Sequence, residues 1–123
     1  MTPNILHIEI QPTRVGLERF GAALAGARAG QPVAPYHGVG FETMAQLGAV
    51  FTPERWELVE ALKATGPLTM DALAKHLRRH YRNVYQDVTV LMEWLVIDQE
   101  EDGRVFVPWD EIDVRWPLTR HAA

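Results

Sequence analysis

An α+β fold is predicted by three features of the sequence. Residues 5–10, ILHIEI, alternate apolar and polar side chains, which is the period of a half-buried strand. Segments between residues 52 and 95 carry apolar residues at spacings of three and four, the period of an amphipathic helix. The dipeptide Asp102-Gly103 then separates two short apolar segments, which is typical of a β-hairpin turn. Strands and helices therefore occupy different parts of the chain, as in α+β proteins.

The N-terminal part, residues 1–50, is predicted to be a strand-helix extension. Apolar residues recur from Leu17 to Ala27 and predict a helix over about residues 13–28. Residues 29–40 are rich in glycine and proline and are predicted to be a loop, followed by a short helix within residues 41–50. We expect this extension to contact a second copy of the chain or another protein.

Helix start signals sharpen the prediction for residues 51–118. Thr52 is a plausible N-cap followed by Pro53, and Thr69 is a second N-cap that opens a helix from residue 70 to 77. Residues 112–116 alternate and predict a last strand, which could pair with residues 5–10 within one chain or between two copies. A third helix begins near residue 81, and its predicted core face comprises Tyr81, Val84, Val88, Leu91 and Leu95.

Three helices followed by a β-hairpin are the layout of a winged helix-turn-helix, although another small α+β arrangement remains the alternative. In a helix-turn-helix, the start of the second motif helix enters the major groove of DNA. Arginine can bind guanine there, and asparagine or glutamine can bind adenine, whereas other contacts go to phosphates. The candidate DNA-binding residues are Thr69, Lys75, Arg78, Arg79, Tyr81, Arg82, Asn83, Tyr85, Gln86, Thr89 and Arg104.

Charge is unevenly distributed along the chain. The net charge is −4, yet residues 75–86 contain Lys75 and three arginines without an acid. An ordinary solvated helix face is the alternative interpretation, but arginines near a helix start oppose the helix dipole. Asp87 argues against DNA contact, although it could orient an arginine or accept a hydrogen bond from cytosine N4. Residues 98–113 contain seven acids and the single cation Arg104, so the hairpin is expected to hold phosphate poorly.

Other classes of function find little support. The chain has no cysteine, which excludes disulfides and thiolate metal sites. His76 and His80 are four residues apart, but no third zinc ligand is evident. The acids of residues 100–113 do not follow a calcium-loop spacing and are expected to form a solvated surface. No catalytic motif, cofactor motif, signal peptide or membrane span is recognised, so we expect a cytoplasmic protein that is not an enzyme and has no cofactor.

Four stretches of the chain together resemble one protein family: FTPERWELVEAL, GPLTMDALAKHL, YRNVYQDVTVL and EDGRVFVPWDEI. They are similar to small prokaryotic winged helix-turn-helix transcriptional regulators that bind DNA, some of which act as antitoxins of toxin–antitoxin pairs. The resemblance covers residues 51–118 closely and the N-terminal half loosely. In the family pattern YKNVHRDV, the residues that match Arg82, Asn83, Gln86 and Asp87 are Lys, Asn, Arg and Asp.

The resemblance implies a DNA-binding repressor that could regulate its own gene. We expect the protein to bind double-stranded DNA as a homodimer, because palindromic half-sites require two recognition helices. The resemblance also leaves open a protein-interaction module, an antitoxin or scaffold that binds a cognate toxin through the acidic hairpin and the apolar N-terminal half. Two departures from the family matter. Gln86 replaces a basic residue, and Trp94-Leu95-Val96 replaces Leu-Gly-Leu, which removes a glycine where the chain must turn.

Overall fold

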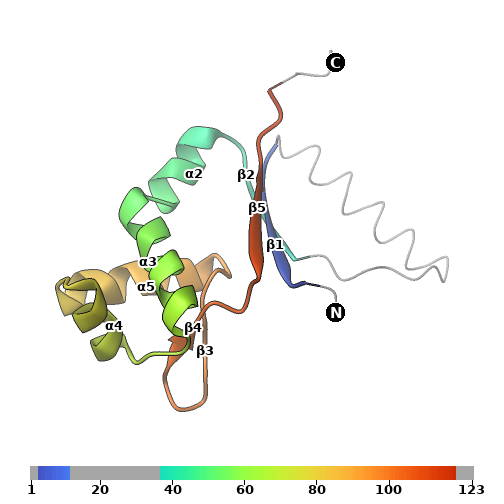
Figure 1. The fold of residues 1–123 in the computed structure, drawn as a ribbon. Helices are drawn as coiled ribbons and strands as arrows, with labels where there is room; N and C mark the ends of the chain where they lie inside the picture. The colour runs from blue at the N-terminus through green and yellow to red at the C-terminus, as the bar shows by residue number, and fades with distance from the viewer. Residues whose placement is uncertain (1–2, 12–36, 119–123) are drawn as a thin grey trace. The chain divides into compact units, whose positions relative to one another are not determined.

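The computed structural model describes residues 3–11 and 37–118 and shows an α+β protein, which confirms the predicted class (Figure 1). The chain groups into two compact units. The first comprises residues 1–4 and 49–110, and the second comprises residues 5–48 and 111–123. The helix predicted over residues 13–28 lies outside the described residues.

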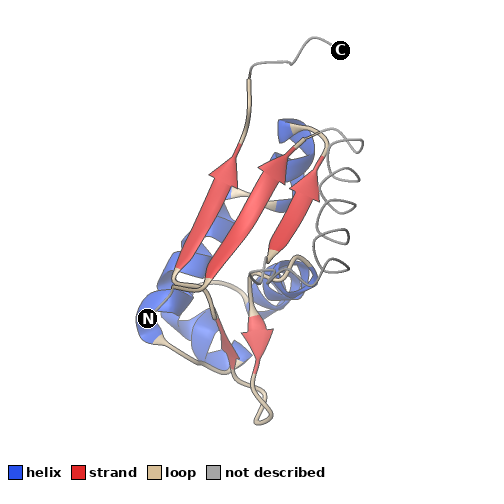
Figure 2. Cartoon of the chain, turned by 90° about the vertical axis from the view of Figure 1, so that its right-hand side faces the viewer, coloured by secondary structure: helices blue, strands red, loops and turns tan. Residues whose placement is uncertain are grey.

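The second unit contains a three-stranded parallel sheet in the order β2-β1-β5, whose strands lie side by side in Figure 2. The central strand β1 (Ile5–Ile10) pairs with β2 (Gly38–Phe41), and on its other side it pairs with β5 (Glu111–Arg115) from Ile5 opposite Glu111 to Glu9 opposite Arg115. The two strands predicted from their alternation are confirmed, and they pair within one chain.

Strand β2 differs from the prediction, which placed a loop over residues 29–40. Gly38 and Gly40 carry no side chain, so the alternation is visible only at Val39 and Phe41. Phe41 is buried, as is Leu47 of the following helix α2 (Met44–Val50). A composition-based loop prediction misses such an edge strand because its backbone pairing, not its side chains, defines it.

The first unit contains the helices α3 (Pro53–Thr65), α4 (Met70–Leu77) and α5 (Tyr81–Glu93). Both predicted N-caps are confirmed. The Thr52 hydroxyl accepts a hydrogen bond from the Arg55 backbone N–H at 3.4 Å, and the Thr69 hydroxyl accepts one from Ala72 at 3.1 Å. The core of this unit includes fully buried residues from all three helices: Leu58, Leu62, Leu73, Val84, Val88 and Leu91.

The predicted hairpin is also present, as the short strands β3 (Asp98–Gln99) and β4 (Val105–Phe106), with Gly103 in a positive-φ conformation at 92°. The connection between α3 and α4 joins this ribbon. Leu68 and Val105 exchange two backbone hydrogen bonds of 3.1 and 2.8 Å. Leu68 therefore extends the hairpin by one residue, although the helices α4 and α5 separate it from β3 in the sequence.

Helix α5 departs from its predicted apolar face at both ends. Tyr81 is 49% exposed because it is the first residue of the helix, and its ring lies against Tyr85, at 6.1 Å between centroids, instead of in the core. Leu95 is 54% exposed because the helix ends at Glu93. The prediction that these two residues lie in the core was wrong.

Leu95 takes the left-handed conformation, with φ 68°, at the end of α5. Its N–H donates to the Met92 carbonyl at 3.1 Å, and the Val96 N–H donates to the Leu91 carbonyl at 2.9 Å, which is a Schellman motif. Val96 and Leu91 are both fully buried and supply the apolar contact of this motif. The chain therefore makes the turn into the hairpin without a glycine, with Leu95 in a strained conformation.

Candidate functional site

The connection between α4 and α5 lies at the centre of the residues that the sequence singles out. Helix α4 ends in a second Schellman motif: the Arg78 N–H donates to Lys75 at 3.2 Å, and the Arg79 N–H donates to Ala74 at 3.1 Å. Arg78 occupies its left-handed position, with φ 55° and ψ 43°, where glycine is the usual residue. This turn directs the chain into α5 after a single further residue, His80.

The start of α5 is an uncapped helix N-terminus. His80 holds the N-cap position without a side-chain hydrogen bond, and the first turn contains no acid. Helices α3 and α4 instead have threonine caps and an acid in the first turn. No side chain of α5 therefore compensates the free N–H groups or the positive end of the helix dipole at its start. The N–H groups and the dipole both favour the binding of an anion there.

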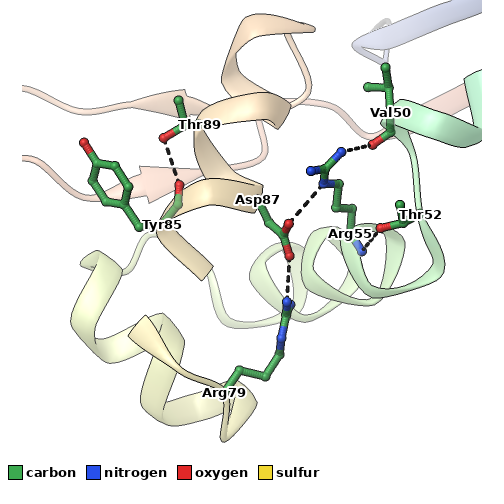
Figure 3. Close-up of polar contacts among 7 residues, drawn as sticks. All are labelled: Val50, Thr52, Arg55, Arg79, Tyr85, Asp87 and Thr89. Carbon is green, nitrogen blue, oxygen red and sulfur yellow. Dashed lines mark hydrogen bonds and ion pairs between the residues drawn. The ribbon is translucent and has the colours of Figure 1, made fainter. Parts of the chain in front are cut away.

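Polar side chains without a partner line the exposed side of this helix start. Arg82, Asn83 and Gln86 are exposed, and within the described part of the chain no hydrogen bond or ion pair involves their side chains. The next row along α5 consists of Tyr81, Tyr85 and Thr89, all exposed. The Thr89 hydroxyl donates to the Tyr85 backbone carbonyl at 2.8 Å, and the Tyr85 side chain points away from the Arg79–Asp87–Arg55 network (Figure 3).

Arg79 has a different environment from its neighbours. Its Nη2 lies 2.7 Å from Oδ2 of Asp87, and Oδ1 of the same carboxylate accepts from Nε of Arg55 at 3.1 Å (Figure 3). The side chains of Asp87 and Arg55 are 14% and 16% exposed, and that of Arg79 is 27% exposed. Nη1 of Arg55 also donates to the Val50 carbonyl at 2.6 Å. One shielded carboxylate thus joins α3, the α4–α5 turn and α5 by charged hydrogen bonds.

This network gives Asp87 one of the two roles considered for it, which is to orient an arginine. Arg55 was missed by the sequence reasoning. A signal for it exists, because a cation in the first turn of a helix opposes the helix dipole and suggests a partner elsewhere. The partner could not be identified from sequence, since Asp87 is 32 residues away.

The remaining predicted residues make local contacts. Thr69 is the N-cap of α4, and Lys75 Nζ lies 3.0 Å from Asp71 Oδ2 one turn earlier on the exposed face of that helix. Arg104 Nη2 and Nε lie 2.9 Å from Glu100 and 2.8 Å from Asp102. Of the candidate residues, those grouped on one exposed surface without a described side-chain ion pair are Arg78, Tyr81, Arg82, Asn83, Tyr85, Gln86 and Thr89.

The hairpin tip is an acidic surface whose only cation is neutralised. The backbone N–H of Arg104 donates to Asp102 and lowers the pKa of that carboxyl, and the guanidinium adds to the effect. Asp102 and Glu100 in turn raise the pKa of Arg104. Glu101 lies at the tip beside them and is exposed. Arg104 therefore has little positive field left to offer a phosphate.

The described residues contain no group of three histidines or acids that could hold a metal ion, and both His76 and His80 are exposed. No helix in the described ranges is long and apolar enough to cross a membrane.

The described residues thus define an α+β protein in which three helices and a hairpin present a basic, polar helix start. The family model HVO_A0114 matches residues 50–114, more than half of the chain, and the protein belongs to this family. No curated protein and no solved structure match the chain.

Proposed function

We propose that this protein is a sequence-specific DNA-binding transcriptional regulator with a winged helix-turn-helix domain, in which α5 reads the major groove. The order of elements supports the proposal: α3, the single bridged residue Leu68, α4, α5 and then the β3–β4 hairpin. In such a domain α4 and α5 form the helix-turn-helix, and the hairpin is the wing.

The observation that carries the proposal is the state of Arg82, Asn83 and Gln86 at the start of α5. These are the residue types that bind guanine and adenine edges in the major groove, they are exposed, and they have no partner among the described residues. They lie where a recognition helix meets the bases first. A purely structural helix would carry acids and a cap at this end, and α5 has neither.

Arg78 supports the same conclusion through its backbone. A non-glycine residue in the left-handed conformation costs about 1–2 kcal/mol, and the exposed side chain makes no described contact that offsets the cost. Strain of this kind concentrates at functional positions. We assign Arg78 to phosphate contact together with Lys75 and Tyr85, whereas Arg79 positions the α4–α5 turn through Asp87.

The test is binding to the DNA upstream of the protein's own gene, compared with an unrelated duplex of equal length over a salt series. The variant Arg82→Ala/Asn83→Ala is expected to lose the preference for its own promoter, at about 1–3 kcal/mol for each base contact, and to retain weak binding. Lys63→Ala is the control, because it removes one exposed cation from α3, outside the helix-turn-helix. Unchanged preference in the double variant would refute the assignment of α5 as the recognition helix.

A second candidate function, binding of a basic partner protein such as a toxin, is favoured by the hairpin tip. The hairpin carries four acids, Asp98, Glu100, Glu101 and Asp102, against the single cation Arg104, which Glu100 and Asp102 already pair, so it would repel DNA phosphates and attract a cationic surface. The same titration separates the two surfaces. Arg104→Ala is expected to leave DNA affinity and its salt dependence unchanged, whereas a loss comparable to that of Arg82→Ala would place the hairpin on DNA.

A further inference from the structure

Strand β5 forms an edge of the three-stranded sheet, and among the described residues its outer side has no neighbouring strand (Figure 2). An edge strand presents unpaired backbone N–H and carbonyl groups, which other strands can pair with. Proteins usually protect such an edge by short length, by proline or by charged side chains on the strand. β5 is five residues long and contains no proline, and its charged residues Glu111, Asp113 and Arg115 are of both signs, so a partner strand can match them.

The edge also carries an apolar row. Ile112 lies beside Leu6 and Val114 beside Ile8 in the register of the sheet, so these side chains point to one face. Leu6 and Ile8 are fully buried, whereas Val114 is 44% exposed and Trp116, two residues further on, is 50% exposed. The apolar face of the sheet therefore continues to its edge and remains uncovered there by the described residues.

We propose that the edge of β5 pairs with β5 of a second copy of this chain, antiparallel, about a two-fold axis at Val114. Residues directly opposite in an antiparallel pair point to the same face, and faces alternate along a strand. A two-fold axis perpendicular to the sheet must therefore pass between the two copies of one residue, which lie directly opposite each other. The pairing joins two three-stranded sheets into one continuous sheet of six strands.

Charge selects Val114 as the central residue. With Val114 at the axis, Asp113 of each copy lies opposite Arg115 of the other copy. Ile112 of each copy likewise lies opposite Trp116 of the other. An axis at Asp113 or Arg115 would place two like charges directly opposite, which destabilises a strand pair. An axis at Ile112 would place Glu111 of each copy opposite Asp113 of the other copy, which are again two like charges. The segment EIDVRW, which is β5 and the residue after it, is thus self-complementary in one register.

The other edge of the sheet, β2, has no comparable alternation of charged and apolar residues. β2 contains glycine at positions 38 and 40, and its Phe41 is already buried. A different protein would have no reason to match the alternation of charge and apolar residues in β5, whereas a second copy matches it by symmetry. The self-complementary register is therefore the reason to choose a second copy of the chain as the occupant.

The first test is the mass in solution of the full-length protein by sedimentation over a concentration series, where a dimer has twice the 13.9 kDa of the monomer. Asp113→Arg and Arg115→Asp each place like charges opposite one another and are expected to be monomers. Mixed together, these two variants are expected to form a heterodimer, because each then supplies the charge that the other needs. Far-UV circular dichroism checks that both variants are folded, since Asp113 also contacts His7 at 3.4 Å.

The second test uses the absence of cysteine from the chain. In Val114→Cys the two sulfurs would meet on the axis, where Cα atoms of opposite residues are about 4.5–5.5 Å apart, within the reach of a disulfide. In the control Glu111→Cys the two cysteines would be about 20 Å apart along the strands. Mild oxidation is expected to cross-link the first variant at least tenfold faster than the second.

A monomeric wild type, equal cross-linking of the two cysteine variants, or single charge variants that remain dimers would each overturn the proposal. Restored association in the mixture and selective cross-linking at position 114 would support it. None of these measurements requires DNA, so the proposal does not depend on the DNA-binding function, and a failure of either leaves the other standing.

Discussion

Replacement of Arg78 by glycine is expected to stabilise the protein while it weakens DNA binding. Arg78 has φ 55° and an exposed side chain without a described contact, so its removal relieves strain and loses no packing. The left-handed conformation costs an L-residue about 1–2 kcal/mol, and the greater freedom of glycine in the unfolded chain offsets about 0.5–1 kcal/mol of this. A net gain of about 0.5–1 kcal/mol remains, which corresponds to roughly 2–5 °C in Tm.

Comparison of Arg78→Gly with Arg78→Ala isolates the backbone effect, because both variants lose the guanidinium. Thermal and urea unfolding followed by circular dichroism should find the glycine variant more stable by about 0.5–1 kcal/mol. In the middle of α5 the order should reverse, with Gln86→Gly about 1 kcal/mol less stable than Gln86→Ala. DNA affinity should fall equally in both Arg78 variants.

Two outcomes would refute this reasoning. If Arg78→Gly is no more stable than Arg78→Ala, the conformation at the end of α4 is not strained. If both variants bind the promoter fragment as tightly as the wild type, with the same salt dependence, Arg78 does not contact phosphate. A lost phosphate contact should reduce the slope of log affinity against log salt by about 1.

Two further predictions concern the charged networks. Asp87→Asn should cost about 2 kcal/mol of stability in urea unfolding, because two charged hydrogen bonds of about 1.5–3 kcal/mol each are weakened in a partly exposed site. Arg79→Ala should cost less, because Arg55 still pairs Asp87. If the two changes in stability simply add in the double variant, Asp87 and Arg79 do not share a network. The pKa of Asp102 is lowered, so its contribution to stability is present above the unfolded value and is lost as pH falls through the lower folded value. An NMR titration should place this pKa below 3.8, and Arg104→Ala should move it part of the way back, whereas a value at or above 3.8 in the wild type would contradict the hydrogen-bonded geometry.

The elements that depend on nearby residues were predicted well from sequence. The caps Thr52 and Thr69, the bounds of α4 and the hairpin at Gly103 all match the structure. Each depends on interactions within about four residues, such as a cap hydrogen bond or the conformation of a glycine in a turn. The alternation that predicted β1 and β5 is equally local, because it records only which side chains alternate between two faces.

Errors occurred where an element begins, ends or lacks side chains. Tyr81 and Leu95 fit the helical period but lie at the ends of α5, where the neighbouring elements no longer cover them. Leu95 also shows that a Schellman turn can form where the sequence suggests that it should not, because buried Val96 and Leu91 fix the chain on both sides of it.

By itself, the sequence determined the order of the helices α3, α4 and α5 and of the hairpin that follows them, the absence of cysteine chemistry and the set of exposed polar residues at the start of α5. Only the tertiary structure decided that Arg79 is held by Asp87 together with Arg55, and that β1 pairs with β5 of the same chain. Arg55 and Asp87 are 32 positions apart in the sequence, and in the β1–β5 pair Ile5 lies opposite Glu111, which is 106 positions (111 − 5) away. Periodicity records which face of an element is buried, whereas the partner of a charge or of a strand edge depends on how distant segments pack together.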